Sequence, residues 1–538
     1  MSSTETNDSL LDESRSGAGQ RRHPRTVSDI AGEILIGRWP SRRSIPVRIQ
    51  DVSSTGTGIT LLLPPGTEDL SNRNATLRWK VPIGKNAVGY KAPVRMAGKL
   101  LAKSDPRRYG FRFDLLVEEE VARRAARPRR LMAGLVAGAI ALAIAALKTR
   151  NIISFWYDPL WQIYSILAAI YVISRIVSSM WYVEPEDHGI IKSLTVVLPV
   201  MNEEQNIESV IRRLFTAHYP AEKFEVIAVD DGSKDGTWAV MQRIAPEFPR
   251  LQIHRFEKNQ GKRHGMAYGA EKATGEILIF MDSDSMIDPE GFYRIIQPFH
   301  DESVGAVAGH TDIIIEEDNF ISKMEAVRYF VSQRVMKAAE SVFGAVNCCP
   351  GPFSAYRKEA VLKILPEWLN QTFLGAAATF GDDRSLTNRM LREYSVVYHA
   401  GARCSTYAPS KWKTFLKQQL RWKKSWVRET TYTAQHMWRE HPLAAIPYYL
   451  SILITLVSPL VVLKACVYAP LVLGTSSYLP YFGGLMLVFL LLGVLYYYHT
   501  QSRYWYYGLV FAVVYSWVFS LQTYYAIVTV RENHWGTR

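Results

Sequence analysis

Five apolar runs constrain this chain most, because most of them are close to, or longer than, the length that a helix needs to cross a lipid bilayer. They lie at about 131–147, 153–180, 446–473, 481–498 and 505–530, and a transmembrane helix needs about 20 mostly apolar residues. The mean hydropathy of −0.05 conceals these runs, since long polar stretches precede and separate them. With 538 residues, the chain is also too long for one core. We therefore predict a protein with several membrane spans and two or three domains.

The distribution of charge indicates a membrane partner and not a nucleic acid. The net charge is +13, but the basic residues are spread along the chain and gather beside apolar runs. Five arginines within 123–130 directly precede the first run, which by the positive-inside rule places the N-terminal region in the cytoplasm. Lys148 and Arg150, beyond that run, count against this orientation but are outnumbered. We expect a multi-pass protein of the bacterial inner (plasma) membrane, with cytoplasmic polar domains and no nucleic-acid partner.

The apolar runs predict how the membrane helices are connected. We expect the first two runs, with the basic linker, to form a helical hairpin over 121–185. Arg175 lies near its cytoplasmic end, where a long side chain can reach the interface. The run at 446–473 contains Pro459, Lys464 and Pro470. It predicts either one kinked helix or a broken pair, so region 440–538 contains three or four helices.

The N-terminal region predicts a small all-β module. Residues 1–19 have almost no aromatic or β-branched content, which is typical of a disordered tail. Over 20–120, short alternating or apolar segments are separated by Gly, Pro, Ser and Asn. This is the pattern of a small antiparallel β-barrel.

Two motifs in this module bring together groups suited to a cyclic dinucleotide. Arg21 and Arg25 stand four apart in QRRHPR, and Asp51, Ser53 and Gly56 lie in DVSSTG. Guanidinium groups bind phosphates bidentately and stack on bases, and an Asp/Ser turn can bond a base edge. Together the motifs resemble the PilZ domain, which implies binding of cyclic di-GMP as an allosteric activator. The alternative is a basic tail followed by an ordinary Asp–Ser turn.

Region 190–430 predicts an α/β domain. Apolar strands at about 194–200, 224–231, 251–256 and 277–280 alternate with helices at about 204–217, 237–245 and 262–274. This alternation is typical of a mostly parallel, doubly wound sheet. Such sheets bind ligands at the carboxyl ends of their strands.

Polar side chains follow each of these strands. Acidic groups suit a ribose, a base edge or a metal ion, and basic groups suit phosphates. Two carboxylates one residue apart, in DSD after the last strand, can hold Mg2+ or Mn2+ on a diphosphate; the alternative is a turn that caps the next helix. We therefore predict a nucleotide-diphosphate site formed by Asn202, Glu203, Asp230, Asp231, Lys262, Arg263, Asp282 and Asp284.

Three motifs lie in the second half of region 190–430: CPGPFSAYR at 349–357, FGDDRSLTNRM at 380–390 and QQLRWKKSWVRE at 418–429. They resemble motifs of hyaluronan synthases and of the related chitin-oligosaccharide synthases. These are inverting family-two glycosyltransferases of the GT-A fold. The resemblance covers about 190–430. It implies a nucleoside contact at Asp230 or Asp231, a diphosphate and metal site at Asp282 and Asp284, and phosphate contacts by Lys262 and Arg263.

The resemblance also assigns the catalytic base and the QxxRW motif. It implies that Asp383, the last acid of GDD, is the base, with Asp382 as the alternative. It implies further that Gln418 and Arg421 meet the diphosphate, and that Trp422 meets the acceptor end. Other interpretations stay open: GDDR can cap the following helix, and QQLRWKKSW can be an interfacial amphipathic helix.

We thus predict a membrane-embedded, processive, inverting glycosyltransferase that extends, and exports, a β-linked exopolysaccharide. Its donor would be a nucleotide sugar, most simply UDP-linked, and its activity would respond to cyclic di-GMP. The expected fold is a PilZ-like barrel, a GT-A domain and transmembrane helices. The alternatives are an enzyme that adds one sugar to a lipid carrier, and a non-catalytic cyclic di-GMP receptor or scaffold. No residue identifies the donor sugar or the linkage.

Overall fold

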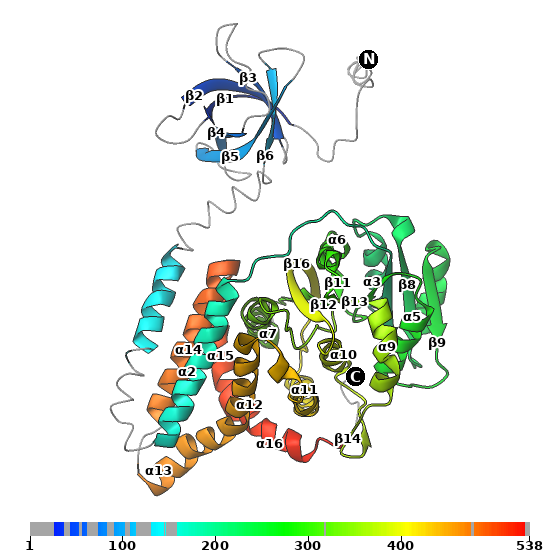
Figure 1. Cartoon of the computed structure of the whole chain (residues 1–538), viewed down its shortest axis with the longest axis vertical. Coiled ribbons are helices and arrows are strands. Elements are labelled where there is room, and N and C mark those ends of the chain that lie inside the picture. Colours follow the sequence, from blue (N-terminus) through cyan, green and yellow to red (C-terminus); the bar gives the residue numbers. More distant parts are fainter. Residues whose placement is uncertain are drawn as a thin grey trace, which may run out of the picture. The chain divides into compact units, whose positions relative to one another are not determined.

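The chain separates into two compact units, Met1–Met132 and Ala133–Arg538, each described here by itself (Figure 1). The computed structural model describes residues 26–36, 43–52, 56–61, 74–82, 91–102, 108–113, 131–144, 146, 159–316, 319–474 and 478–532.

The first unit contains a closed antiparallel barrel of six strands in the order β1-β2-β3-β6-β5-β4. These strands coincide with the alternating segments of the sequence. Asp51 lies near the end of β2 and Gly56 begins β3, whereas Arg21, Arg25 and Ser53 lie outside the described residues. Recognition of cyclic di-GMP by this barrel therefore stays a prediction. The strands are β1 Thr26–Ile36, β2 Arg43–Val52, β3 Gly56–Leu61, β4 Asn74–Pro82, β5 Lys91–Ala102 and β6 Arg108–Phe113.

The second unit is built on an eight-stranded sheet in the order β11-β16-β12-β13-β10-β7-β8-β9. The predicted strands are parallel neighbours. Beyond them β13 is antiparallel to both β10 and β12, so the sheet is mixed. The strands are β7 Leu194–Val200, β8 Phe224–Asp230, β9 Leu251–Arg255, β10 Ile277–Phe280, β11 Met286–Ile287, β12 Val304–Ile314, β13 Ser354–Arg357 and β16 Ser395–Tyr407. A separate hairpin pairs β14 Thr372–Phe373 with β15 Ala376–Ala377.

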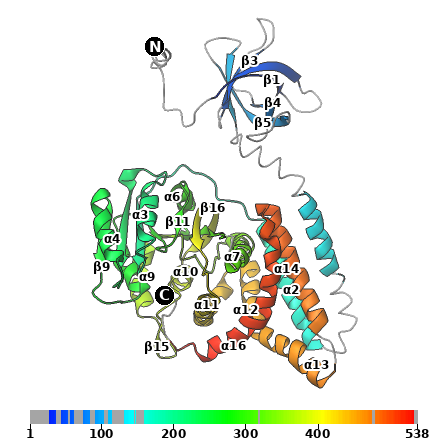
Figure 2. The same ribbon diagram turned by 180° about the vertical axis from the view of Figure 1, so that it is seen from behind.

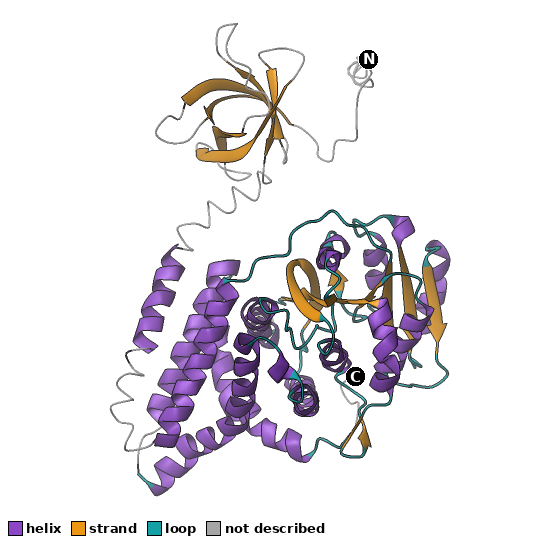
Figure 3. Cartoon of the chain, in the orientation of Figure 1, coloured by secondary structure: helices purple, strands orange, loops and turns teal. Residues whose placement is uncertain are grey.

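Helices cover both faces of this sheet, as alternate strand residues require. One core contains Val196 and Ile279 with the helices α3 Ile207–Phe215, α4 Thr237–Ile244 and α6 Gly291–Ile296. The other contains Val197 and Leu278 with α5 Lys262–Lys272, α9 Lys358–Leu369 and α10 Asp382–Met390. Figure 3 shows this three-layer arrangement. The predicted doubly wound α/β domain is therefore present as a GT-A-like fold with a mixed sheet.

Four helical segments are long and apolar enough to cross a membrane: Trp161–Met180, Pro442–Val472, Tyr481–Thr500 and Arg503–Val528. The first belongs to α2 Pro159–Met180. The second joins α12 Pro442–Leu463 to α13 Ala469–Val472 through a π-helical turn at Lys464–Tyr468, so this run is one irregular helix and not a broken pair. The third is α14 Tyr478–Thr500, and the fourth contains α15 Tyr507–Val514 and α16 Ser520–Val528.

The remaining helices connect these spans to the sheet. A shorter apolar helix, Leu131–Ile144, packs through Ile140 and Ile144 against α14. Helix α7, Phe320–Phe330, continues through a π-helical segment into α8, Ala338–Ser341. Helix α7 and α11, Trp412–Thr433, are seen nearly end-on in Figure 1, where α2 and α14 are seen lengthwise; Figure 2 gives the reverse view. Both helices therefore cross the direction of the spans.

Candidate functional site

Hydrogen bonds tie the loops at the carboxyl ends of the parallel strands together. The backbone N–H of Asn202, after β7, donates to Ser233 Oγ at 2.9 Å, and the N–H of Lys234 donates to Asn202 Oδ1 at 3.0 Å. Asp231, after β8, accepts from the backbone N–H groups of Gln260 and Gly261 at 2.7 and 2.9 Å. The predicted convergence of these loops at one sheet edge is thus present.

Three of the predicted ligand-binding acids have partners within the protein. Glu203 is 3% exposed, and its Oε2 accepts from Asn206 Nδ2 at 3.0 Å. Asp230 is fully buried, accepts from the N–H of Ser233 at 3.0 Å and lies 3.2 Å from Arg255 Nε. Asp231 is 3% exposed, and burial raises the pKa of its carboxyl. All three thus have hydrogen-bond partners within the protein, and their contact with a nucleotide stays a prediction.

The two carboxylates of the DSD motif lie together immediately after β10. Asp282 forms an ion pair with Lys262 Nζ, from the first turn of α5. Thr406 Oγ1 donates to Asp284 Oδ1 at 3.4 Å. Burial, followed by the charge of Asp282, raises the pKa of Asp284 to about 6. Two neighbouring carboxylates that repel each other in this way fit a divalent cation, whose charge would relieve the repulsion.

Within the described part of the chain, no cluster of three or more His, Cys, Asp or Glu side chains has the arrangement of a metal site. The protein groups available to a cation beside Lys262 are therefore the two carboxylates of DSD. A Cβ atom on Gly351, in the CPG motif, would come within 3.0 Å of Asp282 Oδ2. Glycine at this position lets the backbone pass close to the carboxylate.

Lys262 and Arg263 are adjacent in the sequence, but their side chains point in different directions. Lys262 faces Asp282, whereas Arg263 is 3% exposed and turns into the domain interior. There its guanidinium donates to Asp382 Oδ1 at 2.9 Å and to the carbonyl of Trp368 at 2.8 Å. These contacts direct Arg263 away from the DSD pair, so its predicted place on the phosphates is not supported. Consecutive helical residues point about 100° apart, which explains the divergence.

The two adjacent acids of GDD differ in exposure and in their partners. Asp382 is 5% exposed and paired with Arg263, whereas Asp383 is half-buried. Asp383 Oδ1 accepts from the N–H of Arg384 at 2.8 Å, and Cys348 Sγ lies 3.7 Å from Asp383 Oδ2. The N-cap of α10 is Gly381, so the interpretation of GDD as an aspartate cap is wrong. Of the two acids, Asp383 is the one that a substrate can reach.

Gly381 has φ of +79° and is held against α11. A Cβ atom there would lie 1.9 Å from Ser425 Oγ, so only glycine fits both the backbone angle and the contact. Arg428, one turn further along α11, donates to the carbonyl of Phe380. Helix α11 thus fixes the GDD turn and carries the QxxRW motif two turns earlier.

The QxxRW side chains lie in the first half of α11, close to the acidic groups. Burial lowers the pKa of the Arg421 guanidinium, while the carboxylates of Asp282, Asp382 and Asp383 act in the opposite direction. Gln418 Oε1 is buried without a hydrogen-bond partner among the described residues. The guanidinium of Arg328, on α7, lies 5.0 Å from the ring centre of Trp422. The charge of Arg421 therefore interacts with acids of both the DSD and the GDD motifs.

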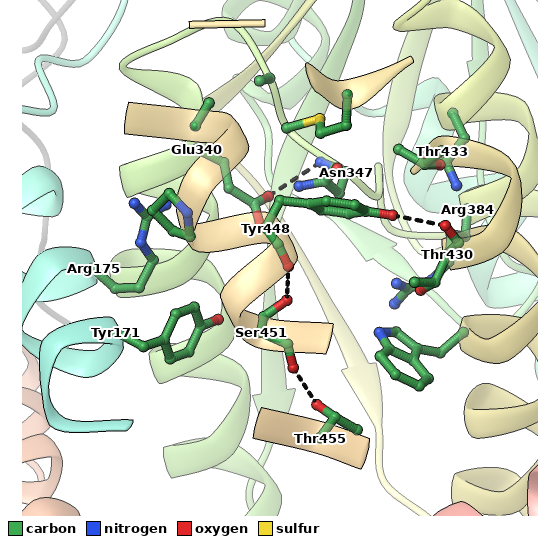
Figure 4. A pocket seen from close by; sticks show the side chains of 16 residues that line it. Tyr171, Arg175, Glu340, Asn347, Arg384, Thr430, Thr433, Tyr448, Ser451 and Thr455 are labelled. Atoms are coloured by element: carbon green, nitrogen blue, oxygen red, sulfur yellow. Dashed lines mark hydrogen bonds between the residues drawn. The ribbon is translucent and has the colours of Figure 1, made fainter. Parts of the chain in front are cut away.

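The sequence did not reveal a polar cavity that begins beside GDD. Its volume is about 230 Å³, and residues of α8, α10, α11 and the membrane helices α2 and α12 line it. Figure 4 shows hydroxyl, amide and charged groups from these helices pointing into it. Arg175, expected at the membrane interface, is instead 4% exposed and donates to the carbonyl of Leu443 at 3.1 Å. The polar lining includes Tyr171, Arg175, Glu340, Asn347, Arg384, Asn388, Thr430, Thr433, Tyr448, Ser451 and Thr455.

Fold and site together define a membrane-embedded glycosyltransferase. Residues 195–365 match the family described as glycosyl transferase family 2. A hyaluronan synthase of Streptococcus pyogenes is 31% identical over 294 residues, which are 53% of this chain and 68% of that protein. Hyaluronan synthase 2 of Bos taurus is 35% identical over 217 residues, 39% of each chain. The chain belongs to the family 2 glycosyltransferases that include the hyaluronan synthases, and is a membrane glycosyltransferase of the polysaccharide-making kind.

Among solved structures, a mannosyltransferase from Pyrobaculum calidifontis in complex with GDP-Man and Mn2+ aligns with 71% of this chain and 98% of its own. The TM-score is 0.46 and the sequence identity 21%.

Proposed function

We propose that this protein is a processive, inverting polysaccharide synthase that transfers sugars from a UDP-linked donor to a growing β-linked chain. The observation that carries the proposal is the polar cavity, which begins at Arg384, next to Asp383, and is lined by α2 and α12. Hydroxyl and amide groups between membrane helices suit a sugar polymer, because each sugar offers several hydroxyl groups to bind.

In the proposed reaction Asp383 takes the proton from the acceptor hydroxyl as that oxygen attacks the anomeric carbon of the donor. The bond from that carbon to the diphosphate breaks in the same step, so the configuration inverts and one base suffices. Lys262 and Arg421 face the position at which negative charge grows on the leaving diphosphate. Mg2+ or Mn2+, held by Asp282, Asp284 and diphosphate oxygens, would neutralise that charge further.

The direct test of the function is a panel of UDP- and GDP-sugars offered to purified protein in sealed vesicles. We expect incorporation from one or two UDP-sugars, dependence on Mg2+ or Mn2+ and loss with a chelator. Products should be long chains on the side opposite the donor. A product of one added sugar would instead identify a lipid-modifying enzyme, and polymer left wholly on the donor side would contradict export.

Filling the cavity with a large side chain should stop elongation of the polymer, while cleavage of the donor and release of UDP continue. Ser451, on α12, lines the cavity, and its hydroxyl donates to the carbonyl of Tyr448 at 2.6 Å. We expect Ser451→Trp to shorten the product from polymer to short oligosaccharides, as read on a gel, while UDP release from the donor continues. The matched control is Leu453→Trp on the same helix, because Leu453 is 48% exposed on the outer surface. Full-length polymer from the Ser451 variant would contradict a passage through the cavity.

The N-terminal motifs support regulation by cyclic di-GMP. RxxxR and DxSxxG occur in order within the N-terminal module upstream of the transferase. We expect Arg25→Ala to abolish stimulation by cyclic di-GMP and to leave basal transfer unchanged, because it removes a phosphate-binding guanidinium remote in sequence from the catalytic motifs. Titration of initial rate against cyclic di-GMP measures both effects, with Arg15→Ala in the same N-terminal region as the control. Undiminished stimulation of the Arg25 variant would overturn the regulatory proposal.

A further inference from the structure

A buried polar network joins the three helices that carry the catalytic motifs. At its centre, Arg263 of α5 pairs with Asp382 of α10, and both are about 95% buried or more. Arg263 Nη1 also donates to Gln371 Oε1 at 3.2 Å. Gln371 Nε2 in turn donates at 2.7 Å to Glu429 of α11, which is fully buried. The network therefore joins α5 directly to α10 and, through Gln371, to α11.

This network is costly to bury, so its presence calls for an explanation. A buried charge loses its hydration, and the attraction within a buried pair often does no more than offset that loss. Arg263 lies over the ring of Trp368 at 5.0 Å, and Arg428 lies over the ring of Phe380 at the same distance. Both guanidinium groups are thus held in one orientation by ring contacts as well as by hydrogen bonds. A cluster of apolar side chains in the same place would stabilise the core equally. It would not fix the rotation of α10 about its own axis.

The rotation of α10 matters because the two acids of GDD are adjacent. With Asp382 anchored inward by Arg263, the next residue points about 100° away around the helix, toward Cys348 and the site. The hydroxyl of Ser385 also donates to Gln371 Oε1 at 2.7 Å, which ties the first turn of α10 to the same network. The anchoring thus sets the direction of Asp383.

We propose that Arg263 and Asp382 are positioning residues, which orient the Asp383 carboxylate and hold it in register with the QxxRW motif of α11. This inference rests on the proposed function, in which Asp383 is the base. Neither residue touches the substrate. Lys262 and Arg263 thereby serve one active site from different faces of α5, the first at the diphosphate and the second through α10.

The test compares Asp382→Asn, Arg263→Met and the double variant in detergent-purified full-length protein. Misorientation of the base should lower kcat about 10- to 100-fold in each single variant, while the donor KM stays within about threefold. Arg263→Lys keeps the charge but loses the forked geometry, so it should recover only part of kcat. Unchanged kcat in the single variants would overturn the proposal.

The pH profile distinguishes positioning from a loss of folded protein. Asp382→Asn leaves the permanent charge of Arg263 uncompensated near Asp383, which should move the acid limb of kcat to lower pH by about one unit. The double variant should return the limb to its original position. An unmoved limb would mean a merely structural role. Among the described residues, other groups whose charges interact with that of Asp383 include Lys262 of α5, Arg421 of α11, Cys348 before β13 and Arg384 of α10 itself.

Failure of this inference is distinguishable from failure of the proposed function. If Asp383→Asn is inactive and the Arg263 and Asp382 variants behave as the unmodified enzyme, only the positioning role is lost. If Asp383→Asn stays active, the base assignment itself is lost. Binding of UDP, measured by calorimetry on every variant, reports whether the donor site is still folded.

Discussion

Replacing Asp383 by Asn is expected to lower the rate of sugar transfer about 10²- to 10⁴-fold, the usual contribution of a general base. The amide keeps the shape and the hydrogen bond from the N–H of Arg384 but cannot accept the acceptor's proton. The nearby thiol of Cys348 cannot replace it, because burial raises the pKa of that thiol well above neutrality. Incorporation of labelled sugar measures the effect.

The matched control is Glu393→Gln, just after α10. Glu393 lies 2.5 Å from Lys363 Nζ and is exposed, so loss of this surface ion pair should have little effect on stability and should leave transfer unchanged. UDP affinity should persist in both variants. Transfer by Asp383→Asn at more than about a tenth of the unmodified rate would contradict a 10²-fold contribution from the base and would reopen the alternative of a non-catalytic scaffold.

The second large effect is expected from Arg421→Ala, with a loss of transfer of about 10²- to 10³-fold. Arg421 is a partly buried cation, and the negative charges of Asp282, Asp382 and Asp383 act on it. In such surroundings a guanidinium stabilises a leaving diphosphate far more than it would in water. Arg421→Lys should recover only part of the rate, because an ammonium lacks the planar fork that binds two phosphate oxygens.

A second cation on α11 provides a control for the Arg421 variant. Lys413→Ala removes an exposed cation from the first turn of the same helix and should leave kcat and donor KM unchanged. Initial rates over a range of donor concentrations separate the two parameters. If Arg421→Ala raised KM alone, the guanidinium would bind the donor without stabilising the transition state, and the proposed mechanism would lose one of its cations.

Much of the architecture follows from local patterns. The strand ILIF at 277–280 and its neighbours are short, apolar and bounded by turn residues, and each lies where the pattern predicts. Parallel strands must end at one edge of a sheet, so the convergence of the loops around Asn202, Asp231 and Lys262 was predictable without coordinates. The lengths of the apolar runs likewise predicted three of the four candidate spans closely.

Other expectations failed where side-chain direction depends on distant packing. Arg263 was predicted at the phosphates because it is a basic group in a loop after a strand, but Trp368 and Gln371, more than a hundred positions away, draw it inward. Arg175 reads as an interfacial residue, yet Leu443 and the cavity hold it in the interior. Contacts between residues so far apart in the sequence cannot be predicted from the local spacing of residues.

The sequence by itself determined the kinds of element in this protein and the chemistry at their ends. Hydrophobic periodicity and turn residues act over a few positions, and that range suffices to place strands, membrane helices and the acids that follow them. Only the tertiary structure decided which of two adjacent aspartates is accessible, which of two adjacent cations reaches the site, and that α2, α8, α10, α11 and α12 enclose a polar cavity. The reason is that a side chain on a helix points where neighbouring helices leave room or offer a partner, and those neighbours are brought by the fold.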